Sequence, residues 1–237
     1  MPTLTPQQEL VLLARALWRE GYNDHLAGHI TINRGDGTLW CNPWLLHWEE
    51  LRPEHVIVID LDGKVLEGDW PAPLGIPLHL ELHRARPDVA VVVHSHPLYA
   101  TVWADICQVP PAMDQSSALG GGGEVVLVDE YGGAVHERGN AAAAVEQFGD
   151  AELGLLAGHG VLVLGSTVRA AHQRAVALEQ RCQRAWHARA ITEGPLVSAL
   201  AGPVLDFFRG SDANGFIGFW EAAVRTELRA DPTLLDG

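Results

Sequence analysis

The segment Val89-Ala90-Val91-Val92-Val93 constrains the fold most, because five consecutive small or β-branched apolar residues leave no polar face. Such a run is typical of a strand buried on both sides in a layered α/β protein. His94-Ser95-His96 follows at once, and Pro97 then ends the strand because proline cannot continue a β-ladder. We therefore expect a sheet covered on both faces, with two histidines at one end of an inner strand.

Helix and strand patterns alternate along the rest of the chain. Residues 29–33 and 38–41 flank the turn Arg34-Gly35-Asp36-Gly37, and a second hairpin is predicted around Asp62-Gly63. Further strands are predicted over 124–128 and 161–164. Helices are predicted over 6–20, 76–86, 97–104, 141–148, 168–190, 196–208 and 218–229. The pattern predicts one α/β domain over residues 1–237, a three-layer αβα arrangement with a central, mostly antiparallel sheet.

The composition excludes several functional classes. Acidic residues outnumber basic ones by 30 to 16, giving a formal net charge of −14, which repels phosphate backbones and argues against nucleic-acid binding. No apolar stretch reaches the roughly 20 residues that span a bilayer, and the first residues lack the pattern of a signal peptide. The three cysteines are few and widely spaced. We expect a cytoplasmic protein with no membrane contact.

The histidines that follow the buried strand have the spacing of metal ligands. Residues two apart on a strand point to the same side, so His94 and His96 project together. His159 lies between Gly158 and Gly160, just before the predicted strand 161–164, and the flanking glycines leave its imidazole uncovered. Three imidazoles with open positions suit a catalytic divalent metal, most readily zinc, with manganese, iron or cobalt as alternatives. The alternative is a set of inert, hydrogen-bonded histidines in turns.

Four segments together resemble the class II aldolase/adducin family, the fold of the sugar-phosphate aldolases that cleave fuculose and rhamnulose phosphates. They are Ala27–Thr31, Asn42-Pro43-Trp44, Arg86–His96 and Gly158-His159-Gly160. The resemblance implies that the three histidines are metal ligands and that the metal stabilises an enediolate. It also implies a C4 homotetramer with active sites at subunit interfaces.

The chain departs from the aldolase pattern at several positions. The resemblance implies a Ser-Ser-Glu before the helix at 76–86, but the position of the acid/base glutamate falls on Gly75, and Pro73 and Leu74 replace the phosphate-binding serines. The early loop has His29 where aldolases usually carry asparagine, and the catalytic tyrosine of the neighbouring subunit corresponds to Gln115. These changes argue against a phosphorylated sugar as substrate.

The preferred function on these grounds is a metal-dependent carbon–carbon lyase that decarboxylates a small non-phosphorylated hydroxy/keto or aromatic carboxylate. Loss of CO2 leaves a carbanion that a metal-bound oxygen can delocalise, and no base is needed first. Asp129-Glu130-Tyr131-Gly132-Gly133 also resembles the adducin-like branch, which includes decarboxylases. The alternatives are a class II aldolase acting on a hydroxy-keto substrate, a non-haem iron oxygenase and a non-catalytic adducin-like module.

The remaining candidate site residues lie on loops near the predicted metal. His29 and His47 are the candidate proton donors, with an ordinary hydrogen-bonding role as the alternative for each. His79 and His83 have the i, i+4 spacing of a helical metal pair, but a solvated helix face is the preferred interpretation. The candidate substrate contacts are Gly28, Asn42, Trp44, Gln115 and Ser116.

Overall fold

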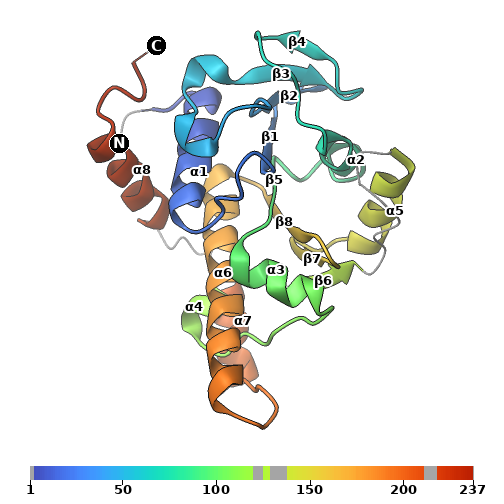
Figure 1. Ribbon diagram of the computed structural model, residues 1–237, viewed down its shortest axis with the longest axis vertical. Helices are drawn as coiled ribbons and strands as arrows, with labels where there is room; N and C mark the ends of the chain where they lie inside the picture. The colour runs from blue at the N-terminus through green and yellow to red at the C-terminus, as the bar shows by residue number, and fades with distance from the viewer. Residues whose placement is uncertain (1–2, 120–124, 129–137, 211–217, 237) are drawn as a thin grey trace.

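The computed structural model describes residues 3–119, 125–128, 138–210 and 218–236 (Figure 1). Within these residues eight strands form one sheet in the order β4-β3-β2-β1-β5-β8-β7-β6. All neighbours are antiparallel except the parallel pair β6 and β7, which confirms the predicted mostly antiparallel sheet. The strands are β1 His29–Asn33, β2 Thr38–Cys41, β3 Ile57–Asp60, β4 Val65–Glu67, β5 Val91–Ser95, β6 Val125–Val128, β7 Leu153–Leu156 and β8 Gly160–Gly165.

Helices cover both faces of this sheet. The helices are α1 Pro6–Arg19, α2 Ile76–Ala85, α3 Leu98–Asp105, α4 Gln115–Ala118, α5 Arg138–Phe148, α6 Val168–Ile191, α7 Gly202–Arg209 and α8 Phe219–Ala230, with two short 3-10 turns, η1 Trp48–Glu50 and η2 Pro53–His55. Val91 and Val93 of β5 pack into a core with α1, α3, α6 and α8, whereas Val92 packs on the other side with α2 and α5. The strand alternation therefore produces the predicted three layers.

Two elements, β7 and α4, are absent from the sequence-based expectation. β5 agrees with the prediction that its strand ends just before Pro97, since His94 and Ser95 both pair with β8, opposite Leu162 and Val161. β7 was not predicted, since a short apolar run that contains Gly154 has no distinctive period. Gly154 is required here because a Cβ would lie 2.5 Å from the Phe148 ring. No helix among the described residues is long and apolar enough to cross a membrane.

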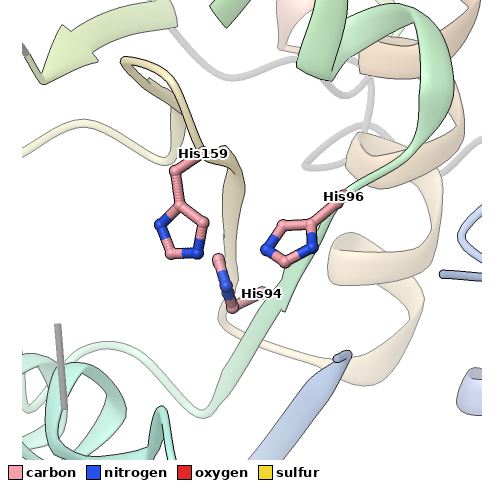
Figure 2. A group of neighbouring side chains, drawn as sticks. All are labelled: His94, His96 and His159. Carbon is pink, nitrogen blue, oxygen red and sulfur yellow. The ribbon is translucent and has the colours of Figure 1, made fainter. Parts of the chain in front are cut away.

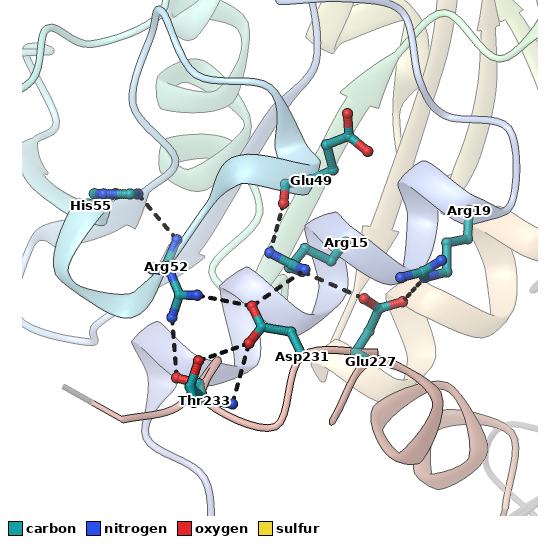
Figure 3. Close-up of polar contacts among 8 residues, drawn as sticks. All are labelled: Arg15, Arg19, Glu49, Arg52, His55, Glu227, Asp231 and Thr233. Carbon is teal, nitrogen blue, oxygen red and sulfur yellow. Dashed lines mark hydrogen bonds and ion pairs between the residues drawn. The ribbon is translucent and has the colours of Figure 1, made fainter. Parts of the chain in front are cut away.

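The C-terminal helix is held against the N-terminal helix by ion pairs (Figure 3). The Glu227 carboxylate of α8 is 1% exposed and pairs with Arg15, at 3.5 Å, and with Arg19 of α1. Asp231, just after α8, accepts a hydrogen bond of 2.9 Å from Arg52. A buried carboxylate is tolerated only when it is paired in this way. These contacts support the proposal that residues 1–237 form one domain.

His172 of α6 gives a prediction for stability at acidic pH. Its ring packs on Trp220 of α8, and neither ring nitrogen has a hydrogen-bond partner among the described residues. Burial lowers the pKa of His172 to about 4. Because the unfolded chain binds this proton at about pH 6.5, folding stability falls as the pH drops below that value. At pH 5 the free energy of unfolding is lowered by about 2 kcal/mol because of His172 alone. Urea unfolding at pH 7.5 and 5 should therefore show a smaller acid destabilisation in His172→Gln than in the parent, and an equal loss in both would contradict the prediction.

Candidate metal centre

Two neighbouring strands bring the three predicted ligands together at one end of the sheet. His94 lies within β5, His96 follows that strand, and His159 lies in the turn that joins β7 to β8. The three rings converge on a common point (Figure 2), with ring centroids 5.0 Å apart for His94 and His96. The His159 centroid is 4.7 Å and 4.8 Å from those of His94 and His96. One nitrogen from each ring lies within 4.8 Å of the others.

Hydrogen bonds orient two of these rings. The Nδ1–H of His94 donates to the carbonyl oxygen of Val161 at 2.9 Å, and His96 Nδ1 lies 2.5 Å from the carboxylate of Asp24. With both Nδ1 atoms engaged, each Nε2 is left as the ligand atom, and the Nε2 of His96 is buried with no partner among the described residues. An imidazole held by a carboxylate or carbonyl on its far side is the usual support of a protein metal site. The donor set therefore fits a divalent metal ion.

Burial keeps the imidazoles of His94 and His159 neutral. It lowers the pKa of His159 to about 4, with a smaller contribution from His96, and it holds the pKa of His94 well below its ordinary value. Neutral imidazoles bind a metal without first losing a proton.

Glycines make the close packing at this centre sterically possible. A Cβ on Gly160 would lie 2.3 Å from the His96 ring and 2.6 Å from the Ser95 carbonyl oxygen, while Gly158 has a φ of +65°. The sequence Gly158-His159-Gly160 is thus explained by one positive φ and one close approach.

Asp24 is a functional candidate that sequence reasoning missed. It lies 72 residues before His96, so no local pattern connects the two. Although burial raises the pKa of this carboxyl, its hydrogen bonds with His96 and His25 hold the pKa below the ordinary value. The negative charge is therefore present to support His96.

We expect Asp24→Asn to weaken metal binding by about 10–100-fold, because an amide orients the His96 ring but no longer supplies the charge. A competition titration with a chelator of known affinity measures the change. The matched control is Asp69→Asn at an exposed loop position, which should bind metal as the parent does. Equal affinities in both variants would remove Asp24 from the site.

His29 borders the centre and occupies the space beside Gly75. It pairs directly with His94 across β1 and β5, and the two ring centroids are 5.4 Å apart. A Cβ on Gly75, at the start of α2, would lie 2.3 Å from the Cε1 atom of His29. Burial first, and repulsion from His96 and His159 second, lowers the pKa of His29 to about 3. The structure thus brings this predicted catalytic histidine to the metal centre.

Gly28 and Asn42 hold the loop before β1. The Asn42 side chain accepts a hydrogen bond from Ile30 N, at 2.6 Å, and donates to the carbonyl oxygens of Gly28, at 3.3 Å, and Pro43, at 3.2 Å. The Gly28 carbonyl also accepts from Trp48 Nε1, at 3.2 Å. The polar groups of Asn42 are therefore engaged by the backbone, and the predicted substrate contacts of both residues remain predictions.

Four other candidates make their described contacts with residues other than the three histidines. The ring of His47 stacks on Trp18 of α1, with centroids 5.4 Å apart. Gln115 and Ser116 are in α4, which packs on α6 and α7 (Figure 1). Trp44 is half-buried, and its backbone N–H donates to the Pro71 carbonyl at 2.8 Å. The roles of all four remain predictions.

The solvated helix face expected for His79 and His83 is wrong. Their exposed fractions are 0% and 5%, because α2 packs this face against β1. The segment Asp129–Gly133, which carried part of the sequence resemblance, lies outside the described residues.

Comparison with known proteins gives a consistent result. The family model of the Class II Aldolase and Adducin N-terminal domain matches residues 8–186. The 5-methylthioribulose-1-phosphate/5-deoxyribulose-1-phosphate aldolase of Rhodospirillum rubrum is 32% identical over 196 residues, which span 80% of this chain and 84% of that protein. The 5-deoxy-D-ribulose 1-phosphate aldolase of Bacillus thuringiensis is 29% identical over 192 residues, spanning 81% and 89%.

Solved structures show the same fold. The L-fuculose 1-phosphate aldolase of Glaciozyma antarctica superposes with a TM-score of 0.80 at 22% identity, covering 99% of this chain and 96% of that one. An aldolase II superfamily protein from Pseudomonas syringae also has a TM-score of 0.80, at 21% identity, covering 98% and 97%. The resemblance inferred from the four sequence segments is thereby confirmed, and this chain belongs to the class II aldolase and adducin family.

Proposed function

We propose that this protein is a divalent-metal-dependent aldolase that cleaves a small hydroxy-ketone, with His29 in place of the usual glutamate as proton-transfer group. The predicted lyase class is confirmed by the family and by relatives that are named aldolases. Those names support aldol cleavage better than the decarboxylation preferred from the sequence. The metal ligands in this proposal are His94, His96 and His159.

One observation carries the proposal. The imidazole of His29 stands where a side chain at position 75 would be, since a Cβ there would lie 2.3 Å from His29 Cε1. Gly75 is the position at which the sequence resemblance places the acid/base glutamate. The loss of a carboxylate at one position is thus matched by a titratable group that enters the same space from β1. The centre keeps a group that can act as a base, which aldol cleavage requires before the carbon–carbon bond breaks and decarboxylation does not.

A divalent metal, when bound, would polarise the substrate carbonyl, acidify the neighbouring hydroxyl and stabilise the negative charge that forms on cleavage. His29 is neutral, with one acceptor nitrogen. This nitrogen takes the proton from the hydroxyl on the carbon that becomes the aldehyde. The carbon–carbon bond then breaks, its electron pair moves toward the ketone, and the imidazolium returns the proton to the carbon that has gained the electron pair. Asp24 meanwhile keeps His96 oriented.

Two observations favour different substrates, one phosphorylated and one not. The relatives are named for five-carbon ketose 1-phosphates, which favours a short phosphorylated ketose. Pro73 and Leu74, which stand where the resemblance places phosphate-binding serines, have no side-chain donor, and Leu74 is 69% exposed. This apolar pair favours an unphosphorylated substrate of the same size.

The test is an assay of the metal-loaded protein on paired five-carbon ketoses and 1-phosphate ketoses. Aldehyde formation is measured by a coupled dehydrogenase, and CO2 release is measured on hydroxy/keto and aromatic carboxylates. Aldehyde that depends on the metal, with no CO2, is the expected result. Metal-dependent CO2 release without aldehyde formation would replace the aldolase with the decarboxylase, and turnover that requires oxygen would indicate an oxygenase.

We also propose a homotetramer in which α4 contributes Gln115 and Ser116 to a neighbouring centre. Within one chain α4, which carries both residues, packs on α6 and α7 (Figure 1). Leu74, next to Gly75, and Leu98, two residues after His96, are 69% and 65% exposed. Exposed leucines near the centre favour burial by another chain. Sedimentation equilibrium should give four chains per particle, and a monomer at assay concentration would contradict the arrangement.

A further inference from the structure

Four polar side chains lie buried in a line between β1 and α2. We call them the polar strip, and they are His29, Thr31, His79 and His83. Their exposed fractions are 5%, 0%, 0% and 5%. The strip lies between apolar side chains of the cores that α2 forms with the sheet. Burial of polar groups in such a position costs free energy unless they are hydrogen-bonded.

The secondary structure explains why these residues meet. His29 and Thr31 are two apart on β1, and their cross-strand partners His94 and Val92 point to the side of the sheet that α2 covers. His79 and His83 are four apart on α2 and therefore lie on one face of that helix. The strip thus begins beside the metal ligand His94 and runs away from it under α2.

The Thr31 hydroxyl joins the two helix histidines. Its Oγ1 lies 2.9 Å from His79 Nδ1 and 2.8 Å from His83 Nε2. A hydroxyl has one proton, so Thr31 donates to one ring and accepts an N–H from the other. Burial lowers the pKa of both rings, to about 4 for His83, so each is neutral with one donor and one acceptor nitrogen. The proton positions on His79 and His83 are therefore coupled through Thr31.

His79 in turn packs against His29. Their rings meet edge to face, with centroids 5.8 Å apart and an interplanar angle of 68°. His29 is thus enclosed by His79, by His94 and by the backbone of Gly75. His79 Nε2 and His29 Nδ1 are buried with no hydrogen-bond partner among the described residues. Apolar side chains of similar shape would fill this space at lower cost, so stability alone does not account for the strip.

We propose that Thr31, His79 and His83 are positioning residues for His29: Thr31 holds His79 and His83 through its hydroxyl, and the His79 ring holds the His29 ring in one orientation at the metal centre. This inference rests on the proposed function for its catalytic consequence, but the orientation itself can be measured without turnover. Metal-binding histidines are commonly oriented by residues behind them. In this protein the polar strip would orient a histidine that is not itself a ligand.

The test compares Thr31→Val with Thr31→Ser in the full, metal-loaded chain. Valine keeps the volume and the strand preference but removes the hydroxyl, whereas serine retains it. Thr101→Val is the matched control, because the Thr101 hydroxyl is buried in α3 with no partner among the described residues. Nitrogen-15 shifts of the histidine rings report the tautomer of His79 and the surroundings of the His29 ring. Steady-state kinetics and bound metal are measured on the same samples.

Thr31→Val should change the ring nitrogen shifts of both His79 and His29 and lower kcat about tenfold with KM within about twofold, at unchanged metal content. Thr31→Ser and Thr101→Val should match the parent. Unchanged His29 shifts in Thr31→Val would overturn the proposal, as would an equal kinetic loss in Thr31→Ser. Changed shifts in a protein that cleaves no ketose would leave the positioning role standing and remove the aldolase function. If Thr31→Val fails to fold, His79→Gln is measured in its place, with the His29 ring shifts, the kinetics and the bound metal as its readouts.

Discussion

Replacing His94 with alanine is expected to release the bound metal and to lower kcat/KM by at least about 10³-fold. His94 supplies the most buried of the three ligand rings, and its Nδ1–H is already committed to the Val161 carbonyl. Two remaining imidazoles do not complete the three-nitrogen set on which the centre depends. Lewis-acid stabilisation is worth several kcal/mol, and about 4 kcal/mol corresponds to about 10³ in rate. Elemental analysis of the purified variant and an assay with added metal measure the two effects.

The control for this variant is His187→Asn, since His187 is exposed on α6 and contacts only Tyr99 and Trp186 among the rings described. His159→Asn is a second test because its side chain lies in a turn, so its removal leaves the sheet intact. Both ligand variants should retain the parent's circular dichroism spectrum while losing metal and activity. Full activity in a metal-free His94→Ala protein would exclude a metal-dependent reaction at this centre.

The ligand set could be predicted from the sequence because each of its signals is local. The strand alternation places His94 and His96 on one side, Pro97 ends the segment, and the glycines beside His159 mark a turn. The hairpin at residues 34–37 was predicted with its strand ends, since the turn residues fix the register. The strand β7 was missed because its stability comes from pairing with β6 and β8, which no short window reveals.

The supporting residues could not be predicted because they are joined only by the tertiary structure. Asp24 supports His96 across 72 residues, and Thr31 meets His83 across 52. The His79–His83 spacing was recognised, but whether that helix face meets water or a sheet depends on the packing of α2. The resemblance identified position 75 as the one that lacks the glutamate. That His29 occupies the same space follows only from the register of β1 against β5 in the structure.

Exchanging the groups at positions 29 and 75 should restore part of the activity that each single change removes. Gly75→Glu alone forces a side chain into the His29 ring, which costs about 1–3 kcal/mol of stability by overpacking and displaces the proton-transfer group. His29→Asn alone removes that group and should lower kcat about 10²–10⁴-fold. The double variant has the asparagine and glutamate that the resemblance places at these positions. Its kcat/KM should exceed the product of the two single effects by at least about tenfold, because residues that compete for one space are not additive.

The steric part of this coupling can be separated from the chemical part with Gly75→Ala, which adds only the Cβ. In the parent background this methyl group should reduce activity and thermal stability, since it lies 2.3 Å from His29 Cε1, whereas in the His29→Asn background it should change stability little. All five variants should bind one equivalent of metal, because neither position is a ligand. Additive losses in the double variant, with intact metal binding and folding, would show that His29 does not take over the role of the glutamate and that another group moves the proton.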